Sequence, residues 1–70
     1  MTLKMNTTDE FVVSMNLNID YSSEQINLRV YSWDKKTQRV NKQDFSASEF
    51  PAALRFYDEE EKTLERKYLK

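Results

Sequence analysis

The densest group of chemically capable side chains is a run of four carboxylates at positions 58–61. Acid–base and nucleophilic catalysis relies most often on histidine or cysteine, and the chain contains neither. On a helix, four successive carboxylates point around most of the circumference rather than toward one substrate. We therefore expect this run to be a solvated helix face, and we expect the chain not to be an enzyme.

The composition also argues against cofactors. Without cysteine and histidine, a thiolate zinc site is excluded and the commonest ligand for zinc, copper or nickel is missing. Hard cations prefer oxygen ligands from a curved loop, so the carboxylate run is a poor metal site. The absence of glycine excludes glycine-rich phosphate loops and leaves turns that need a left-handed residue to Asn, Asp and Ser. We expect no metal and no cofactor.

The second group of interest contains the only tryptophan. Arg29, Tyr31 and Trp33 are spaced by two residues, which in a strand places all three on one face. Tyrosine, tryptophan and arginine are the residue types enriched in binding hot spots. We predict a partner-binding surface, against the alternatives that Trp33 only stacks on Arg39 or is covered by the N-terminal residues or Phe45. The predicted contact residues are Asn16, Asn18, Arg29, Tyr31, Trp33 and Arg39.

Two strands are needed to present that surface. Between residues 11 and 21, apolar side chains occupy every second position, which indicates a strand with one buried face, and residues 26–30 repeat the pattern. A loop over 22–25 would place Tyr21 opposite Ile26 and Leu17 opposite Val30, which joins the two strands as a hairpin.

A third strand is predicted from Arg39 to Phe45 after a turn over 34–38. This spacing would turn Val40 inward opposite Ser32 and place Trp33 opposite Arg39. The strand is polar and carries lysine, which is typical of an edge that resists further pairing. Arg39, Asn41 and Gln43 would then lie on the same outward face as Trp33.

The spacing of apolar residues changes to that of a helix near the C-terminus. Phe50, Ala53, Leu54 and Tyr57 follow i, i+3, i+4, i+7 spacing, with Ser48 as the favoured N-cap. A capping box from Ser46 is the alternative start, and a short fourth strand over 63–69 is the alternative end.

The predicted fold class is α+β: a small two-layer sandwich in which a three-stranded antiparallel meander precedes a C-terminal helix. Residues 1–8 are expected to be a flexible arm, and residues 9–70 a single domain. The predicted core residues alternate along the first two strands and follow the helix stripe: Val13, Met15, Leu17, Ile19, Ile26, Leu28, Val30, Phe50, Ala53, Leu54 and Tyr57.

The predicted function is that of a non-enzymatic protein-binding or accessory module. A domain of 70 residues without disulfides or metal has a small core, and association with a second copy would increase its stability. We therefore expect self-association, with a homodimer as the simplest form. Single-stranded nucleic-acid binding on the aromatic sheet face is the first alternative, although the net charge of −1 argues against it. The second alternative is an inhibitor that mimics DNA through the acidic run.

The remaining expectations concern location and origin. No apolar run approaches the length of a membrane span, the first ten residues lack the apolar core of a signal peptide, and we expect a cytoplasmic protein. The composition, rich in Asn, Lys and Glu, is similar to that of small accessory proteins of low-GC bacteria and their phages.

Overall fold

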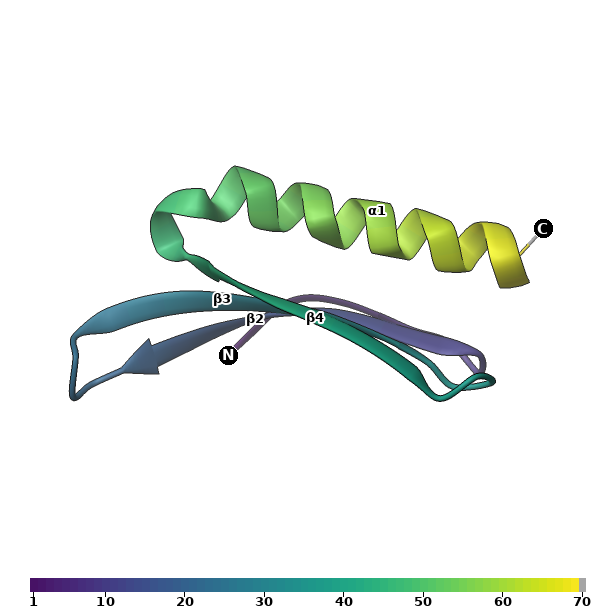
Figure 1. The fold of residues 1–70 in the computed structure, drawn as a ribbon, viewed down its shortest axis with the longest axis horizontal. Helices are drawn as coiled ribbons and strands as arrows, with labels where there is room; N and C mark the ends of the chain where they lie inside the picture. The colour runs from purple at the N-terminus through teal and green to yellow at the C-terminus, as the bar shows by residue number, and fades with distance from the viewer. Residues whose placement is uncertain (70) are drawn as a thin grey trace.

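The computed structural model describes residues 1–69 and has an α+β fold with two layers (Figure 1). One layer is an antiparallel meander of four strands in the order β1-β2-β3-β4, and the other is a single helix. The strands are β1 (Thr2–Thr7), β2 (Phe11–Asp20), β3 (Gln25–Asp34) and β4 (Arg39–Ser46). A short 3₁₀ turn, η1 (Ala47–Glu49), leads into α1 (Phe50–Tyr68). The predicted meander followed by a C-terminal helix is confirmed.

The fourth strand lies at the N-terminus, where we expected a flexible arm. Residues Thr2–Thr7 form β1 and pair with β2, with a bulge between Thr2 and Lys4. The bulge adds one residue to β1 and breaks the period of two, so the segment has no alternation to detect. The alternative strand over 63–69 is not formed, because α1 continues to Tyr68.

The β2–β3 register differs by two residues from the prediction. Ile19 faces Ile26 and Leu17 faces Leu28, and the connecting loop is residues 21–24 rather than 22–25. Asp20 determines this choice, because its carboxylate accepts hydrogen bonds from the backbone N–H groups of Ser22 and Ser23 at 3.0 and 3.4 Å. A shift of two residues leaves every side chain on its predicted face.

The β3–β4 register differs by one residue from the prediction. This difference reverses the two faces of β4, so that each of its side chains points to the face opposite to the predicted one. Trp33 faces Val40, and Leu28 faces Phe45, across a four-residue loop over 35–38. Phe45 therefore points toward the helix and is buried, whereas Val40 lies on the opposite face and is exposed. The prediction that Val40 points inward is wrong.

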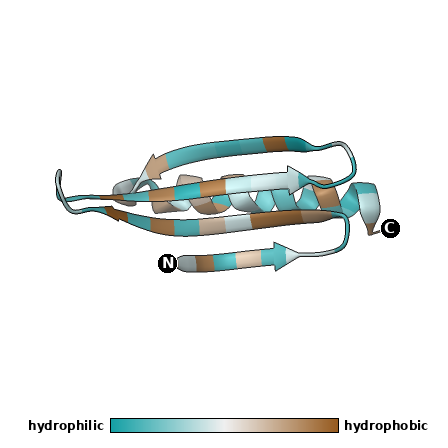
Figure 2. Cartoon of the chain, turned by 90° about the horizontal axis from the view of Figure 1, so that it is seen from below, coloured by the Kyte–Doolittle hydropathy of each residue, from teal (hydrophilic) through white to brown (hydrophobic). Residues whose placement is uncertain are grey.

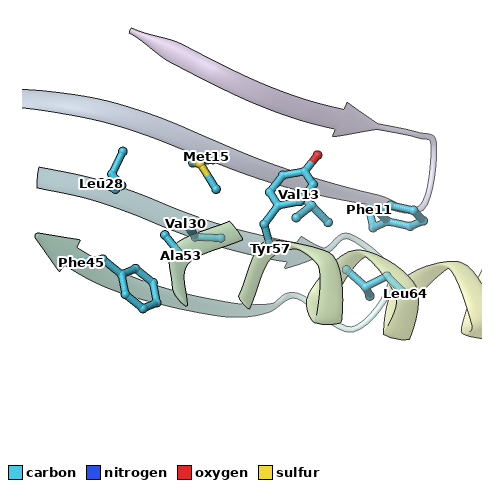
Figure 3. Close-up of a cluster of buried hydrophobic side chains, with 9 residues drawn as sticks. All are labelled: Phe11, Val13, Met15, Leu28, Val30, Phe45, Ala53, Tyr57 and Leu64. Carbon is cyan, nitrogen blue, oxygen red and sulfur yellow. The ribbon is translucent and has the colours of Figure 1, made fainter. Parts of the chain in front are cut away.

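The core lies between α1 and the adjacent face of the sheet (Figure 3). Most of the predicted residues belong to it, and Leu17 and Leu54 pack at its border. Ile19, Ile26 and Phe50 are wrong as core residues, since 44–48% of each is exposed. Ile19 and Ile26 belong to the end of the β2–β3 hairpin, which extends past the start of α1 in Figure 1, and Phe50 is the first residue of that helix. The core residues are Phe11, Val13, Met15, Leu28, Val30, Phe45, Ala53, Tyr57 and Leu64.

The start of the helix uses the alternative that we considered second. Ser46 precedes η1, and its backbone N–H donates to the Glu49 carboxylate at 3.1 Å, as in a capping box. Ser48 lies inside the 3₁₀ turn and is not the N-cap of α1. Because α1 begins at Phe50, Pro51 stays in its first turn, where the missing N–H costs little. Within residues 1–69, no helix is long and apolar enough to cross a membrane.

Candidate functional site

The helix covers one face of the sheet, and among residues 1–69 no other element covers the second face (Figure 2). We call this second surface the open face. Strand alternation puts on it the neighbours of the core residues, and the strand registers fix their order. Its members are Met5, Thr7, Val12, Ser14, Asn16, Asn18, Asn27, Arg29, Tyr31, Trp33, Val40, Lys42 and Asp44.

One cross-strand row on the open face is largely apolar. Trp33 lies between Val12 of β2 and Val40 of β4, and Val12 in turn faces Thr7 of β1. The row therefore crosses all four strands. Val12 is only 8% exposed although no helix or strand in the described part of the chain covers it, so the larger side chains around it must exclude water.

The adjacent row adds a second aromatic residue. Tyr31 faces Ser14 of β2 and Lys42 of β4, and Ser14 faces the exposed Met5 of β1. Ser14 is only 2% exposed, which shows that this part of the open face is also packed by its own side chains. We call the apolar members of the two rows the aromatic band: Met5, Val12, Tyr31, Trp33 and Val40.

The cations near the aromatic band are mostly occupied by partners in the same chain. Arg29 donates two hydrogen bonds to Asp44, at 2.8 and 3.2 Å. The hydrogen bond and the opposite charge raise the pKa of Arg29 and lower that of Asp44. Lys35 lies 5.8 Å from the centroid of the Trp33 ring and donates to the Thr8 carbonyl at 2.8 Å. Among the described residues, neither Lys35 nor Lys42 forms an ion pair, and Lys42 is the cation of the band that is held neither by a carboxylate nor by a carbonyl.

Five of the six predicted contact residues lie on the open face, and one does not. Asn18, Tyr31 and Trp33 are at least partly exposed there, and Arg29 is exposed but held by Asp44. Asn16 is half-buried and is held by hydrogen bonds with Ser14 and Thr2, both at 2.9 Å, so its amide is already used.

Arg39 lies on the helix side of the sheet, because the one-residue change in register reverses β4. Asn41 and Gln43 move with it. The alternative that Trp33 only stacks on Arg39 is therefore wrong, and Lys35 is the cation over the Trp33 ring.

Sequence reasoning missed the aliphatic half of the band. Val12 is an apolar residue between two inward positions of a strand, and this signal was present in the sequence. Val40 was predicted to point inward because of the wrong loop length, and Met5 was assigned to a flexible arm. The errors at Val40 and Met5 both concern the pairing of an edge strand, which sequence patterns specify least.

The carboxylate run is engaged with the sheet, contrary to the solvated face that we predicted. Glu60 accepts hydrogen bonds from Ser32 at 2.7 Å and from Asn41 at 2.8 Å. Glu61 accepts one from Asn6 at 3.1 Å, and Asp58 lies 3.6 Å from the Lys4 ammonium. Three of the four carboxylates therefore tie α1 to β1, β3 and β4.

A polar cleft of about 220 Å³ lies between α1 and the ends of β3 and β4. Its wall contains Arg39 together with groups that already satisfy one another, such as Glu60 with Asn41 and Asp34 with Lys67. Within residues 1–69, no cluster of three or more Asp or Glu side chains has the arrangement of a metal site. Among the described residues, the cleft thus offers Arg39 as its one cation outside these pairs and no convergent set of reactive groups.

The chain matches no protein-family model, no curated protein and no solved structure. The function of this chain is therefore inferred from the geometry of the open face.

Proposed function

We propose that this chain is a non-enzymatic protein-binding module that holds its partner on the aromatic band. The observation that carries this proposal is the row from Thr7 through Val12 and Trp33 to Val40, which crosses all four strands on the open face. Aromatic anchors on a rigid sheet bind with little loss of side-chain entropy, and tryptophan and tyrosine dominate interface hot spots. The surrounding Asn, Arg and Lys side chains supply a polar rim.

The charges on the open face favour protein over single-stranded nucleic acid. A nucleic-acid groove needs several cations that can follow the phosphates. Here Arg29 is neutralised by Asp44, Lys35 is held at Thr8, and Arg39 faces the helix. One free lysine beside two aromatic rings is a weak basis for phosphate binding.

The acidic run gives little support to a DNA-mimicking inhibitor. Such an inhibitor presents its carboxylates to a basic groove in the partner. Three of the four carboxylates of this run contact the sheet of their own chain instead.

Selection of binding peptides tests the proposal without a known partner. Peptides that bind would be selected from a random library displayed on phage, with the wild-type protein immobilised. The affinity of each recovered peptide would then be measured for the wild type and for the variants. We expect Trp33→Ala to weaken the binding of these peptides by at least about 2 kcal/mol, the loss of binding free energy that defines a hot spot. Tyr21→Ala is the matched control, because Tyr21 is an exposed aromatic residue in the β2–β3 loop, outside the band.

Two results would count against the proposal. One is that every recovered peptide binds Trp33→Ala as well as it binds the wild type. The other is tight binding of a single-stranded oligothymidylate that requires Trp33 and falls steeply with salt, which would indicate a nucleic-acid surface.

A further inference from the structure

The two edges of the sheet differ in how well they are protected against further pairing. Edge strands expose unpaired N–H and C=O groups, and bulges are one of the devices that block them. β1 is interrupted by its bulge, whereas β4 pairs with β3 over eight consecutive residues without one. All residues of β4 except Phe45 are exposed, and its outer edge has no strand beside it among the described residues. β4 is therefore the edge open to another strand.

The sequence of β4 is complementary to itself in the antiparallel direction. Lys42 and Asp44 lie on the same face, one on each side of Gln43. If two copies of β4 pair with Gln43 opposite Gln43, Lys42 of each copy lies opposite Asp44 of the other. Opposite charges in directly facing positions stabilise a strand pair, and like charges destabilise it.

The charges already present in the monomer extend this pattern. Asp44 is bound by Arg29 on the neighbouring strand β3. In the pair, Lys42 of the second copy would reach the same carboxylate from the other side and give a row of alternating charges. A lysine on an edge strand normally deters pairing. Here it would restrict pairing to a strand that carries a carboxylate at the matching position.

We propose that two copies of this chain associate through their β4 strands, in antiparallel register around Gln43, to form one continuous eight-stranded sheet. The two-fold axis is then perpendicular to the sheet, so both open faces lie on the same side and the two aromatic bands share one surface. The interface is made by the edge of β4 and does not use Trp33. It gives this small domain the second copy that its size favours.

A charge-exchange experiment tests this interface. Sedimentation velocity of the wild type from micromolar to millimolar concentration should show a monomer–dimer equilibrium. Lys42→Glu places two carboxylates opposite one another, and Asp44→Lys places two ammonium groups opposite one another. We expect each variant alone to dimerise about tenfold more weakly, or worse.

An equimolar mixture of the two variants should recover the dimer. In the mixed dimer, one copy carries a carboxylate at both positions 42 and 44, and the other copy carries an ammonium group at both. Opposite charges therefore face each other in both pairs across the interface, as they do in the wild type.

Controls separate this proposal from the proposed function. Lys36→Glu changes the same type of charge in the loop after β3, outside β4, and should dimerise as the wild type does. Trp33→Ala should lose peptide binding and keep the dimer, so a failure of the proposed function can be told from a failure of the proposed dimer. Because Asp44→Lys loses its contact with Arg29, circular dichroism would check that the variant folds.

Hydrogen–deuterium exchange of the wild type gives a second measurement that needs no variant. β4 amides should be protected more strongly at the higher protein concentration. The proposal is overturned by a wild type that stays monomeric, by a mixture that does not recover the dimer when both variants fold, or by β4 amides that exchange equally at both concentrations.

Discussion

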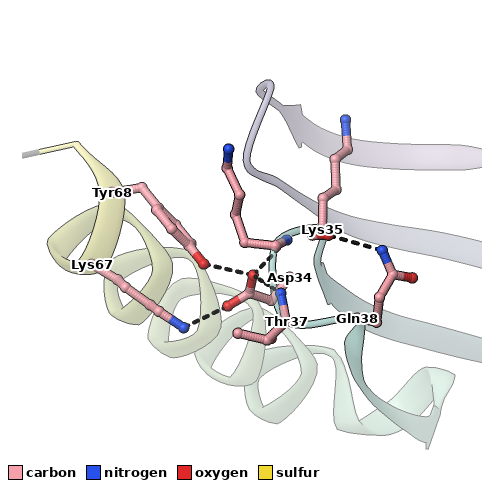
Figure 4. Close-up of polar contacts among 7 residues, drawn as sticks. Asp34, Lys35, Thr37, Gln38, Lys67 and Tyr68 are labelled. Atoms are coloured by element: carbon pink, nitrogen blue, oxygen red, sulfur yellow. Dashed lines mark hydrogen bonds and ion pairs between the residues drawn. The ribbon is translucent and has the colours of Figure 1, made fainter.

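The ammonium group of Lys67 lies 2.7 Å from the carboxylate of Asp34, so the last turn of α1 is held against the end of β3. The Tyr68 hydroxyl donates to the same carboxylate at 2.7 Å, and the backbone N–H groups of Lys36 and Thr37 donate to it from the following loop (Figure 4). The carboxylate is buried, so this one side chain joins the helix, the strand and the β3–β4 loop.

These contacts make the stability of the fold depend on pH in the acidic range. The hydrogen bonds from Lys67 and Tyr68 hold the pKa of Asp34 well below its usual range. The group therefore stabilises the fold above the unfolded-state pKa of about 4, and that contribution is lost as the pH falls toward the folded-state pKa. Asp34→Asn should melt at a lower temperature than the wild type at pH 7, and the difference should shrink in strong acid. Circular dichroism melts across this range would show it, with Glu24→Gln as an exposed control. Equal melting temperatures at pH 7 would contradict the role of Asp34.

Both later hairpins use the same loop construction. Asp20 and Asp34 each accept hydrogen bonds from backbone N–H groups of the four-residue loop that follows. The last loop residue, Glu24 or Gln38, has a positive φ of 56° or 60°. A chain without glycine must place ordinary residues in this left-handed conformation, which carries a steric cost.

That cost predicts a stabilising substitution. Glu24→Gly removes the steric strain and loses some stability through the greater freedom of the unfolded chain. We expect a net increase in the free energy of unfolding of up to about 1 kcal/mol. Urea denaturation of Glu24→Gly beside Ser23→Gly, a neighbouring loop position without a positive φ, would measure it. The expectation fails if both glycine variants are destabilised equally.

Tyr57 is fully buried in the core, and its hydroxyl makes no hydrogen bond to any described residue. Burial, together with the negative charge of nearby Glu61, raises the pKa of Tyr57 to about 12. The folded state therefore keeps this proton when the unfolded state has lost it, and stability falls as the pH rises from about 10 to 12.

Tyr57→Phe should remove both effects. We expect the variant to be as stable as the wild type or more stable at pH 7, because an unpaired buried hydroxyl costs free energy. Its stability should also fall less between pH 10 and pH 12. Urea denaturation at neutral and alkaline pH would test this, with Tyr21→Phe as the exposed control. A clear loss of stability at pH 7 would mean that the hydroxyl has a partner.

The sequence predicted the face of the sheet on which a side chain lies better than it predicted the residue opposite it on the next strand. The alternation along β2 and β3 assigned Leu28 and Tyr31 to opposite faces, and this survived the register difference of two residues. The predicted burial of Ile19 and Ile26 was wrong, because the alternation along a strand cannot show how much of the hairpin the helix covers. At the candidate site, Trp33 was placed correctly by β3 itself, whereas Arg39 depended on the length of a loop.

The reversal of β4 is the point where the sequence prediction and the structure differ most, and two substitutions distinguish them. Val40 and Phe45 lie at positions of opposite parity, so only one of them can face the helix. In the structure Phe45 is buried, with its ring centroid 6.0 Å from that of Phe56, while Val40 is 59% exposed.

Phe45→Ala should therefore lower the free energy of unfolding by about 3 kcal/mol or more, the cost of removing a large core side chain. Val40→Ala should lower it by less than about 0.5 kcal/mol, as is usual at exposed positions. Urea denaturation followed by circular dichroism would measure both. The opposite ranking would restore the five-residue loop and return Arg39 to the open face. It would also turn Lys42 and Asp44 toward the helix, which would remove the charge pattern proposed for the dimer.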